Sequence, residues 1–274
     1  MKDTVTYNEV VCKLRDFFIK RGFKEVPTQS RLSILAACEN PHSVAIFSYN
    51  GEVWPLPQTG QMWLEYELLK NPDWQGVFCI STSYRDEKTP IVGRHEKIFP
   101  MFEFESRGDM KDLEQLEADL LLHLGFGTPV VVEYNDVCHE YDDVAILEDE
   151  HEQRMWREKG PIVSLQHFPE RTSPFWNMRH AGEGIYNKID VIMYGQETIG
   201  SAERSCDVSE MRNTFYTISE GTYAAKLFEL FGKERVEKEL EEFLAFDFFP
   251  RFGAGIGLTR LARAWKLCHS KADS

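Results

Sequence analysis

Apolar and polar side chains alternate with a helical period near the start of the chain. Residues 7–21 place apolar side chains on one face, at Val10, Val11, Leu14, Phe17 and Phe18. This three-to-four spacing predicts an amphipathic helix. Gly22 ends the helix, and residues 23–26 begin a strand.

The following segments predict a hairpin and a helix. Residues 44–54 alternate around Asn50-Gly51, which is a strong signal for a tight hairpin turn. Residues 61–69 predict a helix with Leu64 and Leu68 on one face. Asn71-Pro72 ends it.

A long strand pair comes next. Residues 76–84 form an apolar run that leads into a charged loop, residues 85–97. In the return strand, residues 99–105, the polar-facing positions Met101, Glu103 and Glu105 alternate with Phe102 and Phe104. Because successive side chains of a strand point to opposite faces, we expect a carboxylate-bearing face opposite a buried one.

The remaining pattern mixes helices and strands without regular alternation. Helices are predicted at 112–124, 148–159, 222–244 (broken at Gly232) and 258–267, and strands at 129–134, 161–168, 188–194 and 252–257. The charged helix 148–159 is typical of a solvated face. The order predicts an α+β fold with a large, mainly antiparallel sheet flanked by helices, in one domain over residues 1–274. A Rossmann fold is not favoured.

Composition and charge narrow the class of protein. The chain has 274 residues, 42% of them hydrophobic, and a formal net charge of −14. It has no membrane-length apolar run and no apolar segment of a signal peptide, and its six cysteines are scattered. We therefore expect a cytoplasmic protein with reduced thiols. Because Lys and Arg dominate affinity for nucleic acid, an acidic chain makes tRNA an unlikely partner.

The first candidate for chemistry lies in the charged loop and its flanking strands. Arg85 ends the apolar strand, and its planar guanidinium fits phosphate oxygens. Glu87 lies on the same side of an extended chain, where it would accept from an adenine amino group. Arg94 and His95 would reach the outer phosphates of ATP, and Phe99 would stack on adenine.

The second candidate is the glycine-rich run of residues 253–257, which enters the last helix. Its glycines permit close backbone approach, and Arg260 would cover the other face of adenine. The spacing also fits a dinucleotide site or plain glycine packing. Asp190 and Glu197 bracket a turn and would hold Mg²⁺ together with phosphate oxygens. Two ordinary sheet-edge acids are the alternative.

These residues resemble the catalytic domain of class II aminoacyl-tRNA synthetases. Residues 84–99 are similar to the second motif of that class, and residues 253–260 to the third. The aspartyl/asparaginyl branch is indicated by further segments that match in order, Ala37-Cys38-Glu39, 59–65, Glu150-His151-Glu152, Pro174-Phe175-Trp176 and 197–204. The match runs from about residue 7 to residue 266.

The resemblance implies roles for the amino-acid pocket. Glu39 and Gln61 would hold the substrate ammonium group, and Arg204 would bind the oxygen-bearing end of the amino acid. Arg85 would contact the α-phosphate and the reacting carboxylate. Leu64 stands where aspartyl enzymes usually have lysine, so the chain resembles the asparaginyl enzymes.

Three positions depart from the pattern of the family. Gln29 stands in place of the proline of the first motif, and that motif forms the dimer interface in this class. Thr259 replaces the acid that usually precedes Arg260. Gly200 replaces a serine that supports the metal. A homodimer is still expected. We expect no counterpart of the anticodon-reading β-barrel of this branch, roughly 100 residues long, because the segment that resembles the catalytic core begins almost at Met1.

A core of this kind, acidic and without a barrel, resembles the asparagine synthetases related to this branch. The leading expectation is an AMP-forming ligase that activates the β-carboxylate of aspartate with ATP and Mg²⁺ and transfers it to ammonia. One alternative is adenylation of an aspartate- or asparagine-type amino acid for another acceptor, which would be a metabolite amine, a carrier protein or tRNA. The other is a regulatory paralogue that binds ligands without catalysis.

Overall fold

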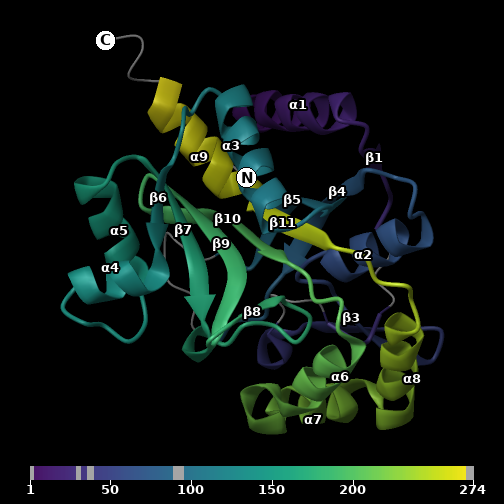
Figure 1. The fold of residues 1–274 in the computed structure, drawn as a ribbon. Helices are drawn as coiled ribbons and strands as arrows, with labels where there is room; N and C mark the ends of the chain where they lie inside the picture. Colours follow the sequence, from purple (N-terminus) through teal and green to yellow (C-terminus); the bar gives the residue numbers. More distant parts are fainter. Residues whose placement is uncertain (1–2, 29–31, 36–39, 89–95, 270–274) are drawn as a thin grey trace.

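The computed structural model describes residues 3–28, 32–35, 40–88 and 96–269. Its centre is a nine-stranded sheet (Figure 1). Eight strands follow the order β1 (Lys24–Glu25), β4 (Gly76–Tyr84), β5 (Ile98–Arg107), β11 (Arg251–Gly257), β10 (Gln196–Glu203), β9 (Ile185–Met193), β7 (Ile162–Pro169) and β6 (Val130–Glu133), and β8 (His180–Gly182) pairs with β9. Among these pairs only β1–β4 and β6–β7 are parallel. The predicted α+β class with a mainly antiparallel sheet is confirmed.

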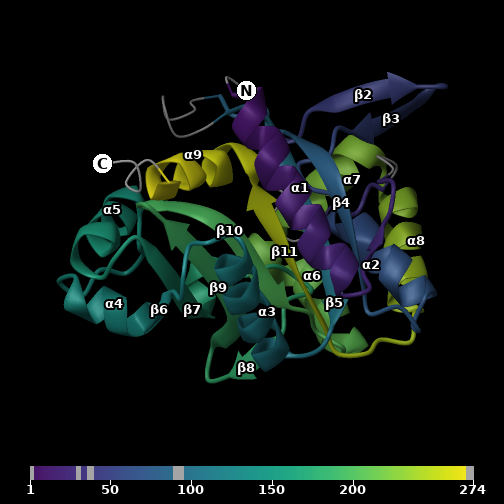
Figure 2. The ribbon, with the colours of Figure 1, turned by 90° about the horizontal axis from the view of Figure 1, so that it is seen from above.

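Three helices cover one face of the sheet, α1 (Thr4–Lys20), α3 (Met110–His123) and α9 (Leu258–His269). Figure 2 shows α1 and α3 lying across the strands. The predicted apolar stripe of the first helix, including Leu14 and Phe18, is fully buried against Phe78, Phe102 and Phe104 of the sheet. This layer is the largest hydrophobic core of the described chain.

The remaining helices form two further groups. Helices α2 (Gln61–Lys70), α6 (Val208–Thr217), α7 (Thr222–Phe231) and α8 (Lys233–Leu244) share a second apolar cluster, and α4 (Tyr134–Glu140) and α5 (Asp149–Glu158) contribute to a third beside β7. The hairpin of β2 (Ile46–Tyr49) and β3 (Glu52–Pro55) turns at Asn50-Gly51, as predicted. Short 3₁₀ helices occupy Pro41–Ser43, Glu170–Thr172 and Ile218–Gly221. None of the helices in the described part of the chain has the length and apolar character needed to cross a membrane.

Several short elements lie outside the sequence predictions, namely α4, α6 and β8. Each is too short, or too mixed in polarity, for a periodic pattern to stand out. The expected strand–turn–strand around Asp190 and Glu197 is present, because β9 and β10 pair across Tyr194-Gly195. Both turn residues have positive φ, 50° and 75°, the conformation of a tight hairpin turn.

The two faces of β5 differ from the expectation in one respect. Phe102 and Phe104 are fully buried, as predicted. Glu103 and Glu105 are also fully buried, so the carboxylate-bearing face is covered instead of open. The pattern could reveal the alternation of the strand, but it could not reveal that α2 packs across the second face.

Candidate active site

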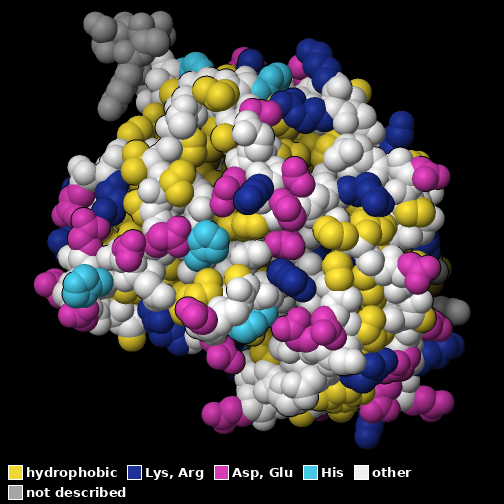
Figure 3. Space-filling model, in the orientation of Figure 1, with side chains coloured by type: hydrophobic (Ala, Val, Ile, Leu, Met, Phe, Trp, Pro, Cys, Tyr) yellow, Lys and Arg dark blue, Asp and Glu magenta, His cyan; other side chains and the backbone are white. Residues whose placement is uncertain are grey.

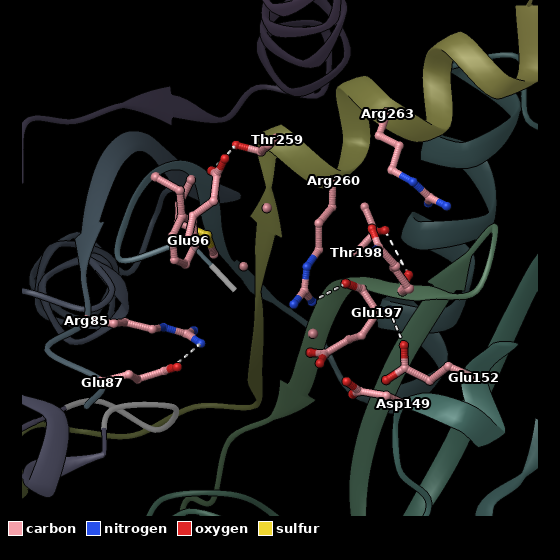
Figure 4. Close-up of a pocket in the computed structure, with 16 residues that line it drawn as sticks. Arg85, Glu87, Glu96, Asp149, Glu152, Glu197, Thr198, Thr259, Arg260 and Arg263 are labelled. Carbon is pink, nitrogen blue, oxygen red and sulfur yellow. Dashed lines mark hydrogen bonds and ion pairs between the residues drawn. The ribbon is translucent and has the colours of Figure 1, made fainter. Parts of the chain in front are cut away.

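A cavity of about 320 Å³ opens on the side of the sheet that carries these carboxylates. Six segments line it (Figure 4): the end of β4 with Arg85 and Glu87, β5 with Phe99, α5 with Asp149 and Glu152, β10 with Glu197, β11 with Gly255 and Gly257, and the start of α9 with Arg260. Of the six described residues predicted to bind ATP or magnesium, five line the cavity, namely Arg85, Glu87, Phe99, Arg260 and Glu197, whereas Asp190 does not.

The residues of the second motif form one unit at the mouth of the cavity. The Arg85 guanidinium lies 4.0 Å from Glu87 and 5.2 Å from the centroid of the Phe99 ring. The Arg85 backbone N–H donates to the Lys97 carbonyl at 2.8 Å, which fixes the direction in which the strand leaves the sheet. The other two predicted phosphate contacts, Arg94 and His95, lie outside the described residues.

Glycines form the floor of the cavity. A Cβ atom at Gly255 would lie 2.9 Å from Cε of Met101, and one at Gly200 would lie 3.0 Å from Oε1 of Glu197. A side chain at either position would therefore have to displace the end of Met101 or of Glu197. The floor is therefore bare backbone that a flat ligand can approach.

The carboxylates predicted to hold magnesium face the same point. A Cβ at Gly200 would also lie 3.5 Å from Oδ1 of Asp190, a buried atom without a hydrogen-bond partner in the described structure. Burial raises the pKa of Asp190 to about 7 against the opposing effect of Lys188, whose Nζ lies 2.6 Å from Oδ2. An orphaned carboxylate oxygen beside a second carboxylate, Glu197, fits a divalent cation. Mg²⁺ commonly takes one or two carboxylates together with phosphate and water, and no larger group of potential metal ligands occurs among the described residues.

The first turn of α9 ties the third motif to the rest of the site. Nη1 of Arg260 donates to the Glu197 carbonyl at 2.5 Å. The Thr259 hydroxyl donates to Oε2 of Glu96 at 3.0 Å. A carboxylate therefore stands beside the position where the family has an acid, although it comes from another segment. Sequence reasoning missed this link because it joins residues 163 positions apart.

Helix α5 corrects a sequence prediction. It was expected to be a solvated face, but Asp149 and Glu152 line the cavity. Oε2 of Glu152 accepts from the Glu197 backbone N–H at 2.8 Å and thereby positions the β9–β10 turn. The signal that could have revealed this role was the match of Glu150-His151-Glu152 to the family, which outweighs the general expectation for a charged helix.

The residues predicted for the amino-acid pocket lie deeper. Gln61 is buried at the start of α2, and Leu64 packs in a small apolar cluster with Val77 and Cys79. Arg204 is 1% exposed and does not line the cavity. Glu39 lies outside the described residues. The roles of Glu39, Gln61 and Arg204 therefore stay predictions.

Arg204 belongs to a buried ionic cluster that the sequence did not reveal. Its Nε and Nη2 donate to Oε1 of Glu105 at 3.0 and 2.5 Å. Arg251 donates twice to Oε2 of Glu65, at 3.1 and 2.7 Å, and the Asn177 amide donates to the other oxygen of Glu65 at 2.8 Å. All four charged side chains are at most 1% exposed.

A second cavity of about 320 Å³ lies at the start of α2 and the later half of β4. Its lining includes Thr59, Gly60 and Ser81, and none of the described residues that line it is charged. Glu103 lies beneath it and accepts from the Thr59 and Ser81 hydroxyls and from the Gly60 N–H at 2.8 Å. Burial raises the pKa of Glu103, and these hydrogen bonds oppose the shift.

A large antiparallel sheet with a glycine-floored cavity between two arginine-bearing motifs defines the catalytic core of a class II synthetase. The family of class II tRNA synthetases (D, K and N) matches residues 3–270, so the chain belongs to this family. The resemblance seen in the motifs is thus confirmed. The comparison with curated proteins gives no significant match.

Solved structures of the aspartyl and asparaginyl enzymes share the fold. Asparaginyl-tRNA synthetase from Pyrococcus horikoshii, complexed with asparaginyl-adenylate, is 18% identical with a TM-score of 0.78, over 96% of this chain and 65% of that chain. The Entamoeba histolytica asparaginyl enzyme is 17% identical with a TM-score of 0.73 (95% and 62%), and a putative aspartyl enzyme from Leishmania major is 15% identical with a TM-score of 0.72 (95% and 61%). The chain thus spans less than two thirds of these relatives.

Proposed function

We propose that the protein is an AMP-forming ligase that activates aspartate with ATP and transfers the acyl group to ammonia, giving asparagine. The observation that carries the proposal is the convergence of Arg85, Phe99, Glu197 and Arg260 around one glycine-floored cavity. Each part has a counterpart in the chemistry of adenylate formation, and the site belongs to a family whose fold neighbours include adenylate complexes.

In this proposal adenine lies between Phe99 and Arg260, and Glu87 accepts from its amino group. The Arg85 guanidinium contacts the α-phosphate and the reacting carboxylate, where it stabilises negative charge that develops during in-line attack. Asp190 and Glu197 would hold Mg²⁺, which supplies charge neutralisation at the phosphates of ATP.

The reaction then has two steps. A carboxylate oxygen of aspartate attacks the α-phosphorus, and the bond to pyrophosphate breaks. Ammonia next attacks the acyl carbon, AMP leaves with the bonding electron pair, and the nitrogen loses a proton. The enzyme contributes orientation and charge stabilisation without a covalent intermediate.

Charge favours a small amine nucleophile over tRNA. Among the described residues that line the cavity, five are acidic (Glu87, Glu96, Asp149, Glu152 and Glu197) and three are arginines (Arg85, Arg260 and Arg263). On the face shown in Figure 3, basic side chains are scattered among acidic ones and form no broad basic surface. The face in Figure 3 therefore offers tRNA no broad basic surface, while the acidic side chains at the cavity favour a small cation such as ammonium.

A second candidate keeps the activation and changes the acceptor. The second cavity, at about 320 Å³, is larger than a single small molecule such as ammonia needs. Its described lining includes the apolar side chains of Leu32, Ile34 and Met62, which favours an organic amine with an apolar body as the nucleophile. Both candidates therefore share the adenylation half-reaction and differ in the second step.

Product analysis with ATP, Mg²⁺, aspartate and ammonium tests the proposal. Asparagine together with AMP, in the absence of tRNA, is the expected result. Asparagine with ADP would reject the adenylate mechanism. Pyrophosphate exchange without asparagine would keep the activation and point to the second candidate, which assays with organic amines then examine. Absence of both exchange and product would refute the proposal.

A further inference from the structure

The positive and negative charges of the buried ionic cluster balance. Two guanidinium groups, of Arg204 and Arg251, face two carboxylates, of Glu65 and Glu105, and all four are at most 1% exposed. A further buried charge that enters such a cluster without a partner is strongly disfavoured. Any ligand that reaches Arg204 must therefore bring no net charge, or the cluster must change its own charge.

The Glu105 carboxylate occupies the place in front of Arg204 that a ligand would take. A Cβ atom at Gly253 would overlap Oε1 of Glu105, so this side chain lies directly on the glycine floor. Gly255 and Gly257, further along the same face of β11, line the cavity of the candidate active site. The Glu105–Arg204 pair thus closes the inner end of the floor whose outer end is the cavity.

Binding of aspartate would upset the charge balance of this cluster. Because Arg204 is predicted to bind the oxygen-bearing end of the amino acid, a carboxylate of aspartate that is not activated beside Arg85 would lie at Arg204. This holds whichever of its two carboxylates reacts. A second carboxylate at Arg204 would give three acids against two arginines. An amide end, as in asparagine, would leave the cluster balanced.

We propose that Glu105 gates the Arg204 subsite by taking up a proton: a ligand carboxylate binds Arg204 only when Glu105 is neutral, whereas an amide end binds whether or not it is. The inference rests on the proposed activation of an aspartate- or asparagine-type amino acid. It makes the choice between these two substrates dependent on pH.

The surroundings of Glu105 single it out as the group that takes the proton. Glu65 on α2 is held by Arg251 from β11 and by Asn177, and Glu103 on the same strand is held by two hydroxyls and a backbone N–H. In contrast, Oε2 of Glu105 is buried without a hydrogen-bond partner in the described structure. Burial raises the pKa of Glu105 to about 7, with Glu65 adding to the shift and Arg204 opposing it.

Calorimetry on the unaltered protein tests the gate. Aspartate and asparagine are titrated in buffers of different ionisation enthalpy at pH 6 and pH 8. Binding of aspartate at pH 8 should take up about one proton, and binding at pH 6 almost none, because Glu105 with a pKa of about 7 is already protonated there. Asparagine should take up none at either pH. Aspartate binding at pH 8 without proton uptake would overturn the inference.

Pyrophosphate exchange gives an independent measurement. With a pKa of about 7, the neutral fraction of Glu105 falls about tenfold between pH 6 and pH 8. The ratio of kcat/KM for aspartate to that for asparagine should fall by the same factor. The Glu105→Gln variant should make the ratio independent of pH. The Glu203→Gln variant, which changes a carboxylate on β10 bonded to Asn187 outside the cluster, should keep the dependence.

The outcomes separate the gate from the proposed function. A ratio that stays constant from pH 6 to pH 8 in the unaltered protein overturns the gate and leaves the activation standing. Failure of both amino acids to bind and to support exchange overturns the proposed function and the gate with it. If Glu105→Gln does not fold, the calorimetry of the unaltered protein decides the question alone.

Discussion

The buried carboxyl group of Glu117 should make the stability of the protein depend on pH, by an amount that can be measured. This residue of α3 is 3% exposed, and neither carboxylate oxygen has a hydrogen-bond partner among the described residues. Burial raises its pKa from 4.5 to about 8, and the effect of Ser201 offsets only part of the shift. The Ser201 hydroxyl instead donates to the Ile189 carbonyl at 3.2 Å. In the folded protein Glu117 is therefore neutral at pH 7.

The sign of the pH dependence follows from the raised pKa. Below pH 4.5 the folded and unfolded chains both hold the proton, and the group adds no pH-dependent term. Above that pH the unfolded chain releases the proton and the folded chain keeps it, so the free energy of unfolding falls as pH rises toward 8. A difference of about 3.5 pKa units corresponds to at most about 5 kcal/mol, of which about 2.5 kcal/mol is lost between pH 5 and pH 7.

Urea unfolding of the unaltered protein and of Glu117→Gln at pH 5, 7 and 8 measures this term. The two proteins should be similar at pH 5, and the variant should be more stable by several kcal/mol at pH 8. Glu105, with a pKa of about 7, contributes to the same trend in both proteins. The charge of Asp190 adds to the raised pKa of Glu117, so the difference measures Glu117 together with its effect on Asp190. The control Glu114→Gln removes a half-buried acid of the same helix whose charge contributes least to the raised pKa of Glu117, and it should keep most of the slope. Parallel stability curves for the unaltered protein and Glu117→Gln would refute the reasoning.

Three further predictions concern the site and the assembly. Arg85→Ala should lower pyrophosphate exchange by about 10²–10³-fold, because it removes charge at the reacting phosphate; near-normal exchange would reject the assignment. Gly200→Ala should raise the Mg²⁺ concentration needed for half-maximal exchange, since its Cβ would lie 3.0 Å from Glu197 and 3.5 Å from Asp190; an unchanged Mg²⁺ requirement would argue against the metal assignment. Light scattering should give a homodimer, and a mass near the 31.9 kDa of one chain would contradict it.

Periodic segments of the fold could be predicted because their apolar positions alone determine them. The first helix, the β4–β5 pair and the last helix owe their form to local patterns that match their burial. Helix α6 and strand β8 form in the context of the whole fold. Their short sequences pack onto neighbours that are distant along the chain, and no local period marks them.

The residues of the candidate site also fall into two groups, those that the sequence could predict and those that it could not. Arg85, Phe99 and Arg260 could be placed because family motifs fix their order along the chain, and the cavity collects them. The partners of Arg204 could not be predicted, since Glu105 lies 99 positions away and only the sheet register brings it close. A buried carboxylate also looks like a surface one in sequence.

Strand β5 shows how this fold joins stability to chemistry. One of its faces carries Phe102 and Phe104 into the largest core, while the other carries Glu103 and Glu105, equally buried, to the cavity side. Burying two carboxylates costs free energy unless each is paired, and each here has hydrogen-bond donors from a different element. A protein optimised for stability alone would have apolar residues at these positions. Their retention beside a glycine floor, with both pKa values raised by burial, is typical of groups held ready for a ligand. The alternation of side chains along β5 therefore packs the sheet against its helices on one face and places two acids on the cavity side on the other.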